Sequence, residues 1–220
     1  MTDTVITVQG TFSVKHAPER ATVSVSVSHD GPRREPVFAA TTEVAAAITR
    51  PLQEWRDAAS GPVSTWSSER VGVWSERPWN AEGKQLPLVY HAVLGVEATF
   101  VDFDALARWV ETLATTAGVT VSSIDWALQD ATRDRLLEEV RTKAVQDAAA
   151  KALVYARAAG LTSVTATSIA DPGLLEDADI ARGGMMAASS PRLMKASANL
   201  EFTPAELEIE ARVDARFLAR

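Results

Sequence analysis

The chain has 220 residues, of which 46% are hydrophobic, and it carries a formal charge of −7 with no cysteine. Its length and apolar content suffice for the core of one large globular domain, whereas its negative charge opposes binding to nucleic-acid phosphates or to anionic lipid. The missing cysteines exclude disulfides, thiol catalysis and thiolate metal sites.

At the amino terminus, the stretch MTDTVITVQG has neither the basic segment nor the apolar run of an export signal. It therefore predicts a cytoplasmic protein, with export as the alternative if a leader has been trimmed. No apolar run approaches the roughly 20 residues that span a bilayer, so we expect no membrane insertion.

Two strands open the chain. Apolar residues alternate with polar ones over residues 6–14, and in ATVSVSVSH (21–29) valines alternate with serines. This spacing is typical of strands with one buried and one wetter face. The Pro-containing turn KHAPER joins the two segments, which predicts a hairpin.

Helical spacing of apolar residues predicts the first two of three helices. One begins at Pro36, a residue suited to a first helical position, and reaches Trp55 with a kink or break at Pro51. The next is capped by Asp102 and ends at Gly118.

The third predicted helix is LLEEVRTKAVQDAAAKALVYARAAG, residues 136–160. Its predicted buried stripe consists of Leu137, Val140, Ala144, Ala148, Ala152, Tyr155 and Ala159. Because alanines fill the centre of this stripe, we expect the helix to lie unusually close to the surface that it covers. The pairs Glu139–Lys143 and Asp147–Lys151 have i,i+4 spacing and are expected on its outer side.

Further strands are predicted at 63–74, 88–100, 121–128, 162–169 and 206–217. The last of these alternates most clearly, with apolar residues from Leu207 to Phe217 separated by charged ones. The predicted order is ββα-ββ-α-β-α-β-β. We therefore expect an α+β fold with antiparallel or mixed sheets and three helices packed on one side.

Three quoted segments carry a family resemblance: VQGTFSVKHAPERATVSVSVSHDG, AKALVYARAAGL and NLEFTPAELEIEARVDARFL. Together they resemble the SIMPL-domain family, which is named for a signalling protein that associates with a receptor-linked kinase and includes many bacterial proteins. The resemblance spans nearly the whole chain. It implies one α+β domain over residues 1–220, a tendency to self-associate and no catalytic residues to carry over.

Motifs for catalysis or metal binding are missing from the sequence. The histidines at 16, 29 and 91 form no HxxxH or HxH pair, and no GxSxG, GxGxxG or P-loop pattern occurs. The acidic residues of LLEDADIARGG lack the spacing of a calcium loop. We therefore expect no metal, no cofactor and no enzymatic activity.

Residues 171–199 show no sustained periodicity, which predicts an irregular loop. The loop contains apolar side chains, among them Met185 and Met186. Adaptable methionines suit a surface that packs against a partner, and the alternative is that they cover the chain's own core.

The stretch TWSSERVGVWSERPWNAEGK (65–84) is rich in tryptophan. A strand over 63–74 would place Trp66, Arg70 and Trp74 on one face, where the guanidinium could stack between two indoles. Trp79 would lie at the tip of a long hairpin. Self-packing or subunit contact is favoured, with small-molecule binding and single-stranded nucleic acid as alternatives.

These patterns predict a non-enzymatic binding or scaffold module that forms a homo-oligomer and presents loops to a protein partner. The alternative function is a small-ligand-binding protein or enzyme with a pocket rimmed by Trp66, Trp74 or Trp79. Self-association is expected through the terminal strands, if they lie at sheet edges. Antiparallel copies of the last strand would then pair Glu206, Glu208 and Glu210 with Arg212 and Arg216.

Overall fold

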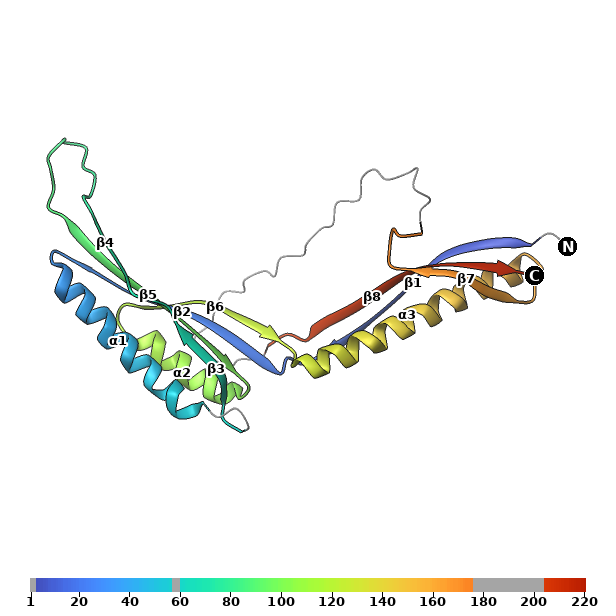
Figure 1. Cartoon of the computed structure of the whole chain (residues 1–220), viewed down its shortest axis with the longest axis horizontal. Helices are drawn as coiled ribbons and strands as arrows, with labels where there is room; N and C mark the ends of the chain where they lie inside the picture. Colours follow the sequence, from blue (N-terminus) through green and yellow to red (C-terminus); the bar gives the residue numbers. More distant parts are fainter. Residues whose placement is uncertain (1–2, 57–59, 176–203) are drawn as a thin grey trace. The chain divides into compact units, whose positions relative to one another are not determined.

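The structure is a computed structural model that describes residues 3–56, 60–175 and 204–220 (Figure 1). These residues form three helices and eight strands, which divide into two compact units. The five-stranded unit contains the described residues of 18–128 and 196–205. The three-stranded unit contains those of 1–17, 129–195 and 206–220. The α+β class is confirmed, and the single domain expected over residues 1–220 stays a prediction.

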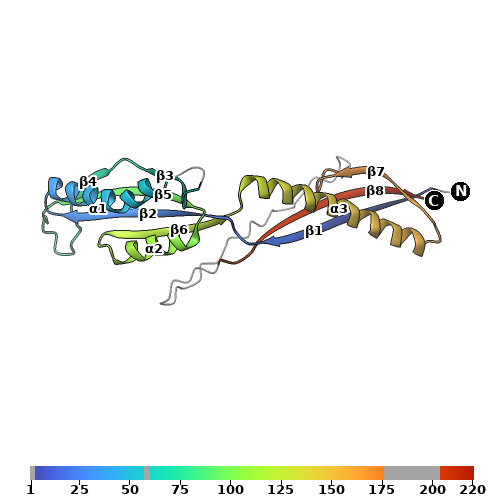
Figure 2. The ribbon, with the colours of Figure 1, turned by 90° about the horizontal axis from the view of Figure 1, so that it is seen from below.

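The five-stranded unit is an antiparallel sheet with two helices on one face, which Figure 2 views from the helix side. Its strands lie in the order β3-β5-β2-β6, and β4 also pairs with β5. The elements are β2 (Arg20–Gly31), α1 (Arg34–Trp55), β3 (Val63–Ser68), β4 (Gly72–Glu76), β5 (Val89–Phe100), α2 (Phe103–Thr115) and β6 (Val119–Ala127).

Alternation along β2 and β5 determines which face the helices cover. Val23, Val25 and Val27 of β2 are buried, as are the even-numbered residues from Ala92 to Phe100 of β5. These side chains form one core cluster with α1 and α2. The serines of β2 therefore lie on the opposite side, which we call the open face. The predicted buried and wetter faces of this strand are confirmed.

The predicted helix ends agree with local chemistry. Asp102 caps α2, because its side chain accepts hydrogen bonds from the backbone of Asp104 and Ala105. Gly118 and Gly160 follow α2 and α3 with positive φ angles of 77° and 79°. The first helix begins two residues before Pro36 and continues past Pro51 to Trp55.

The three-stranded unit has the order β1-β8-β7, with α3 along one face of the sheet (Figure 1). Its elements are β1 (Thr4–His16), α3 (Asp130–Ala158), β7 (Val164–Ala170) and β8 (Leu207–Ala219). The small side chains of Ala144, Ala148 and Ala152 pack with Val8 and the apolar face of β8. No helix of the described residues is long and apolar enough to cross a membrane.

The alanine helix lies as close to its sheet as predicted. A Cβ atom on Gly10 of β1 would lie 2.7 Å from the backbone nitrogen of Ala148, and it would also overlap the carbonyl oxygen of Ala144. The buried row runs through residues 136, 140, 144, 148, 152 and 156. Tyr155 was predicted to be in this row but is 59% exposed. The row advances by four residues at every step, so it continues from residue 152 to residue 156 and does not include residue 155.

Two predicted strand pairings are wrong. The strands β1 and β2 form no hairpin, because β1 pairs with β8 while β2 pairs with β5 and β6. The strand β8 is central rather than an edge, since β1 lies on one side of it and β7 pairs with residues 214–219 on the other. Arg216 thus faces Ser168 of β7, and Arg212 forms an ion pair of 2.7 Å with Glu210 of its own strand. A second copy that paired with Arg216 along this edge would therefore have to displace β7.

Candidate functional site

The predicted common face for Trp66 and Trp74 is wrong, because residues 63–74 form two strands instead of one. In β3, Trp66 pairs with Ala98, a residue of the buried face, and packs against the core cluster. In β4, Trp74 pairs with His91 on the open face and is 49% exposed. The two indoles therefore lie on opposite sides of the sheet.

An extra residue between β3 and β4 produces this inversion. Ser68 pairs with Val96 and Gly72 pairs with Val93, so residues 69–71 stand opposite only residues 94 and 95. Side chains alternate along a strand, and one inserted residue moves every later side chain to the other face. The sequence pattern of Trp66, Arg70 and Trp74 contains no sign of this insertion.

Arg70 lies exposed in the connection between β3 and β4. Within the described residues, the cation–π contact that forms is that of Lys143 over the ring of Phe12, 5.2 Å from its centroid. The predicted stack of Arg70 between two indoles is therefore wrong. Met185 and Met186 lie outside the described residues.

Trp79 is the most exposed large apolar residue of the described chain, with 86% of its surface accessible. It lies in the connection between β4 and β5, where Asn80 organises the turn. The Asn80 side chain accepts hydrogen bonds from the backbone of Glu82 and Lys84, at 3.1 and 3.0 Å, and donates to the Lys84 carbonyl at 2.8 Å. Trp79 thus lies in the connection of a β4–β5 hairpin and directly precedes the turn that Asn80 closes.

A stacked pair occupies the base of this hairpin on the open face. The rings of Trp74 and His91 lie 5.4 Å apart with an interplanar angle of 21°. The buried Nε2 of His91 makes no hydrogen bond, and it lies 3.5 Å from a carboxylate oxygen of Glu76. We call β4, the connection 77–88 and the paired residues 89–93 of β5 the tryptophan hairpin.

Beside the hairpin, the open face contains a shallow depression of about 320 Å³. Its hydroxyl groups come from Ser24, Ser26, Ser67 and Ser122, on three different strands. Glu69 bends over Gly95, so that its carboxylate lies 2.8 Å from the position of a Cβ atom at Gly95. With Glu97 it makes this surface acidic as well as hydroxyl-rich. Gly95, a glycine inside a strand, was the sequence signal that could have predicted the close approach of Glu69.

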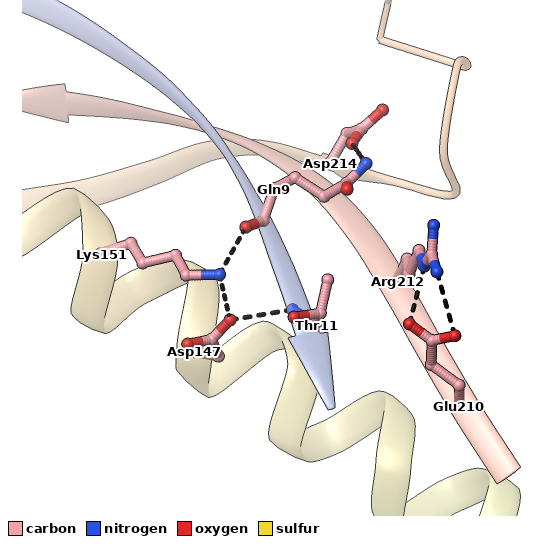
Figure 3. Close-up of polar contacts among 7 residues, drawn as sticks. All are labelled: Gln9, Thr11, Asp147, Lys151, Glu210, Arg212 and Asp214. Carbon is pink, nitrogen blue, oxygen red and sulfur yellow. Dashed lines mark hydrogen bonds and ion pairs between the residues drawn. The ribbon is translucent and has the colours of Figure 1, made fainter. Parts of the chain in front are cut away.

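The strand β1 lies at the edge of its sheet, and an ion pair of α3 binds backbone groups of this edge (Figure 3). Asp147 and Lys151 lie 2.7 Å apart, as their i,i+4 spacing predicted, yet they do not point outward. Asp147 accepts a hydrogen bond of 2.8 Å from the backbone nitrogen of Thr11, and Lys151 donates to the Gln9 carbonyl at 3.1 Å. Two backbone groups that could bind another strand are thus already satisfied.

These contacts determine the electrostatics of the pair. The hydrogen bond from Lys151, followed by that from the Thr11 N–H, holds the pKa of Asp147 below its ordinary value of 3.8. On β8, the hydrogen bond from Arg212 likewise lowers the pKa of Glu210.

The described histidines do not converge. His16 contacts the Ala17 carbonyl, His29 contacts the Thr41 hydroxyl, and His91 stacks on Trp74. No group of three His, Cys, Asp or Glu side chains in the described part of the chain could hold a metal ion. Trp66, Trp74 and Trp79 do not converge either, and none of them lines the depression on the open face.

A family model matches residues 6–217, which include nearly all of both units. Its description is SIMPL, protein of unknown function (DUF541). No curated protein matches the chain.

Proposed function

The chain belongs to the SIMPL family, and from this premise we propose that it is a non-enzymatic, self-associating binding or scaffold module. It contacts its protein partners, a second copy of the chain among them, through the tryptophan hairpin. The observation that supports this proposal is the exposure of two indoles of the tryptophan hairpin, 86% for Trp79 and 49% for Trp74.

The energetic argument starts from the indole surface. An aromatic side chain can bury about 150–250 Å², and burial contributes roughly 25 cal/mol per Å². Covering Trp79 would therefore contribute on the order of 3–5 kcal/mol before the costs of association. Tryptophan is enriched among the residues that dominate binding energy in protein interfaces.

The hydrogen bonds within the hairpin favour binding further. Asn80 holds the turn, and Arg77 donates a hydrogen bond of 2.8 Å to the Leu86 carbonyl. A loop that is already ordered loses less conformational entropy when a partner binds. The acidic, hydroxyl-rich depression next to the hairpin suits a partner that presents basic side chains.

Analytical ultracentrifugation of the wild type and of a Trp74→Ser/Trp79→Ser variant tests the proposal. We expect the wild type to associate with increasing concentration and the variant to associate at least 10-fold more weakly, since each lost indole removes a large contact area. Tyr155→Ser is the matched control, because Tyr155 is 59% exposed and lies in the other unit. A wild type that sediments only as a 23.6 kDa monomer, or a variant with unchanged association, would contradict the proposal.

A further inference from the structure

A second concave surface lies on the helix side of the five-stranded unit and is lined by residues of α1 and α2. Figure 2 shows where these two helices lie. This groove has a volume of about 290 Å³. Its accessible apolar surface comes from Pro51 and Trp55 of α1, whereas Ile48 and Trp109, which also border it, are only 3% and 1% exposed. The open face with the tryptophan hairpin lies on the opposite side of the sheet, so the two surfaces can be tested separately.

Pro51 removes the helical donor of one backbone carbonyl at the groove. In an α-helix the carbonyl of residue 47 accepts from the backbone N–H of residue 51, and proline has no such N–H. The carbonyl of Ala47, which also lines the groove, therefore lacks its helical donor. The neighbouring carbonyl of Ile48 accepts instead from the Trp109 indole nitrogen at 3.0 Å. That indole donor is consequently already used.

Arg108 supplies a positive charge at the rim of the groove. Its side chain is exposed on α2, and within the described residues its guanidinium has no hydrogen bond and no ion pair. Guanidinium groups bind carboxylates through two parallel hydrogen bonds. The groove thus combines the apolar surface of Pro51 and Trp55 with a carbonyl that lacks its helical donor and with the guanidinium of Arg108.

We propose that this groove binds a small aromatic carboxylate. The ring packs against Trp55 and Pro51, and the carboxylate pairs with Arg108. A ring N–H group can donate to the Ala47 carbonyl. A volume of about 290 Å³ lies at the lower end of the range for ligand sites, which limits the ligand to one or two fused rings.

Indole-3-acetate is a suitable probe because it contains an aromatic ring, a ring N–H group and a carboxylate. Indole-3-acetamide is the matched compound without the negative charge. Binding to the full chain is measured by saturation-transfer NMR and isothermal titration calorimetry. We expect a Kd of about 1 mM or tighter for the acid, as for a ligand of about 13 non-hydrogen atoms. The amide should bind about 10-fold more weakly, because it loses the charge-assisted hydrogen bonds to Arg108.

Two variants distinguish this site from unspecific binding. Arg108→Gln should reduce the affinity for the acid about 10-fold and leave that for the amide unchanged. Arg50→Gln removes an exposed charge of α1 outside the groove and should change neither affinity. Unchanged melting temperatures confirm that both variants fold. The inference is overturned if the wild type does not bind indole-3-acetate at millimolar concentration, if acid and amide bind equally, or if Arg108→Gln retains the wild-type affinity.

Discussion

Replacing Gly10 by alanine tests the close contact between α3 and β1. The added methyl group would lie 2.7 Å from the backbone nitrogen and 2.8 Å from the Cβ atom of Ala148, and it would overlap the carbonyl oxygen of Ala144. These neighbours are helix backbone and a short, rigid side chain. They can make room only if α3 as a whole moves away from the sheet.

The size of this movement determines how far Gly10→Ala lowers the free energy of unfolding. Ordinary contacts of a Cβ atom begin near 3.4 Å, so the helix must retreat by at least about 0.7 Å from Ala148. A gap of this size forfeits roughly a quarter to a half of each dispersion contact along the buried row. Overpacking generally costs about 1–3 kcal/mol, and rigid neighbours place Gly10→Ala at the upper end, near 3 kcal/mol. The melting temperature should fall by about 6–12 °C.

Two spectroscopic probes locate the effect. All six tryptophans lie between residues 55 and 126, in the five-stranded unit, so their fluorescence follows that unit. Circular dichroism at 222 nm includes α3, the longest helix of the described chain with 29 residues. We expect Gly10→Ala to shift the dichroism transition in urea more than the fluorescence transition.

Gly72→Ala is the matched control for Gly10→Ala. A Cβ atom there would have its nearest neighbour at 3.9 Å, so the variant should be neutral or slightly stabilised. If Gly10→Ala unfolds at the same urea concentration as the wild type, the contact between helix and strand is not as close as described.

Three other predictions concern packing, pH and metal ions. Ala148→Leu should destabilise the fold by about 1–3 kcal/mol, whereas Gln146→Leu on the exposed side of α3 should be nearly neutral; equal urea midpoints would refute the assigned faces. Because the folded state lowers the pKa of Asp147 from 3.8, its ion pair with Lys151 stabilises the fold above that pH. The stability difference between wild type and Asp147→Asn should therefore be constant from pH 7 to 5 and shrink as the pH falls below about 4; a difference that grows in acid would contradict this sign. EDTA should leave the melting temperature unchanged, and a decrease reversed by a divalent cation would reveal a metal site.

Local patterns in the sequence predicted most of the elements. Alternating valines and serines predicted β2 and its two faces, and Asp102 and Gly118 predicted the limits of α2 and its connection. The alanines of residues 144–152 predicted a close helix contact. These features depend on residues a few positions apart, where the geometry of a strand or a helix determines which side chains share a face.

The candidate surfaces depend on strand register and helix packing, which could not be predicted from the local sequence pattern. The tryptophan spacing predicted one shared face, but residues 69–71 insert an extra residue against β5 and move Trp74 to the open face. The groove was not predicted, because it depends on which residues of α1 and α2 face each other, and local spacing does not specify this. Pro51 was recognised only as a possible break in the helix.

The sequence by itself thus determined the fold class, the approximate limits of the helices and the apolar side of the main strands. Tertiary structure alone decided that β1 pairs with β8 across about 200 residues of chain, and that β8 is central. The physical reason is that periodicity records which side of a strand is buried, whereas backbone hydrogen bonds can join any two strands of suitable length. Pairing is therefore decided by the packing of the whole unit, and a one-residue shift in it reverses the side on which a functional residue lies.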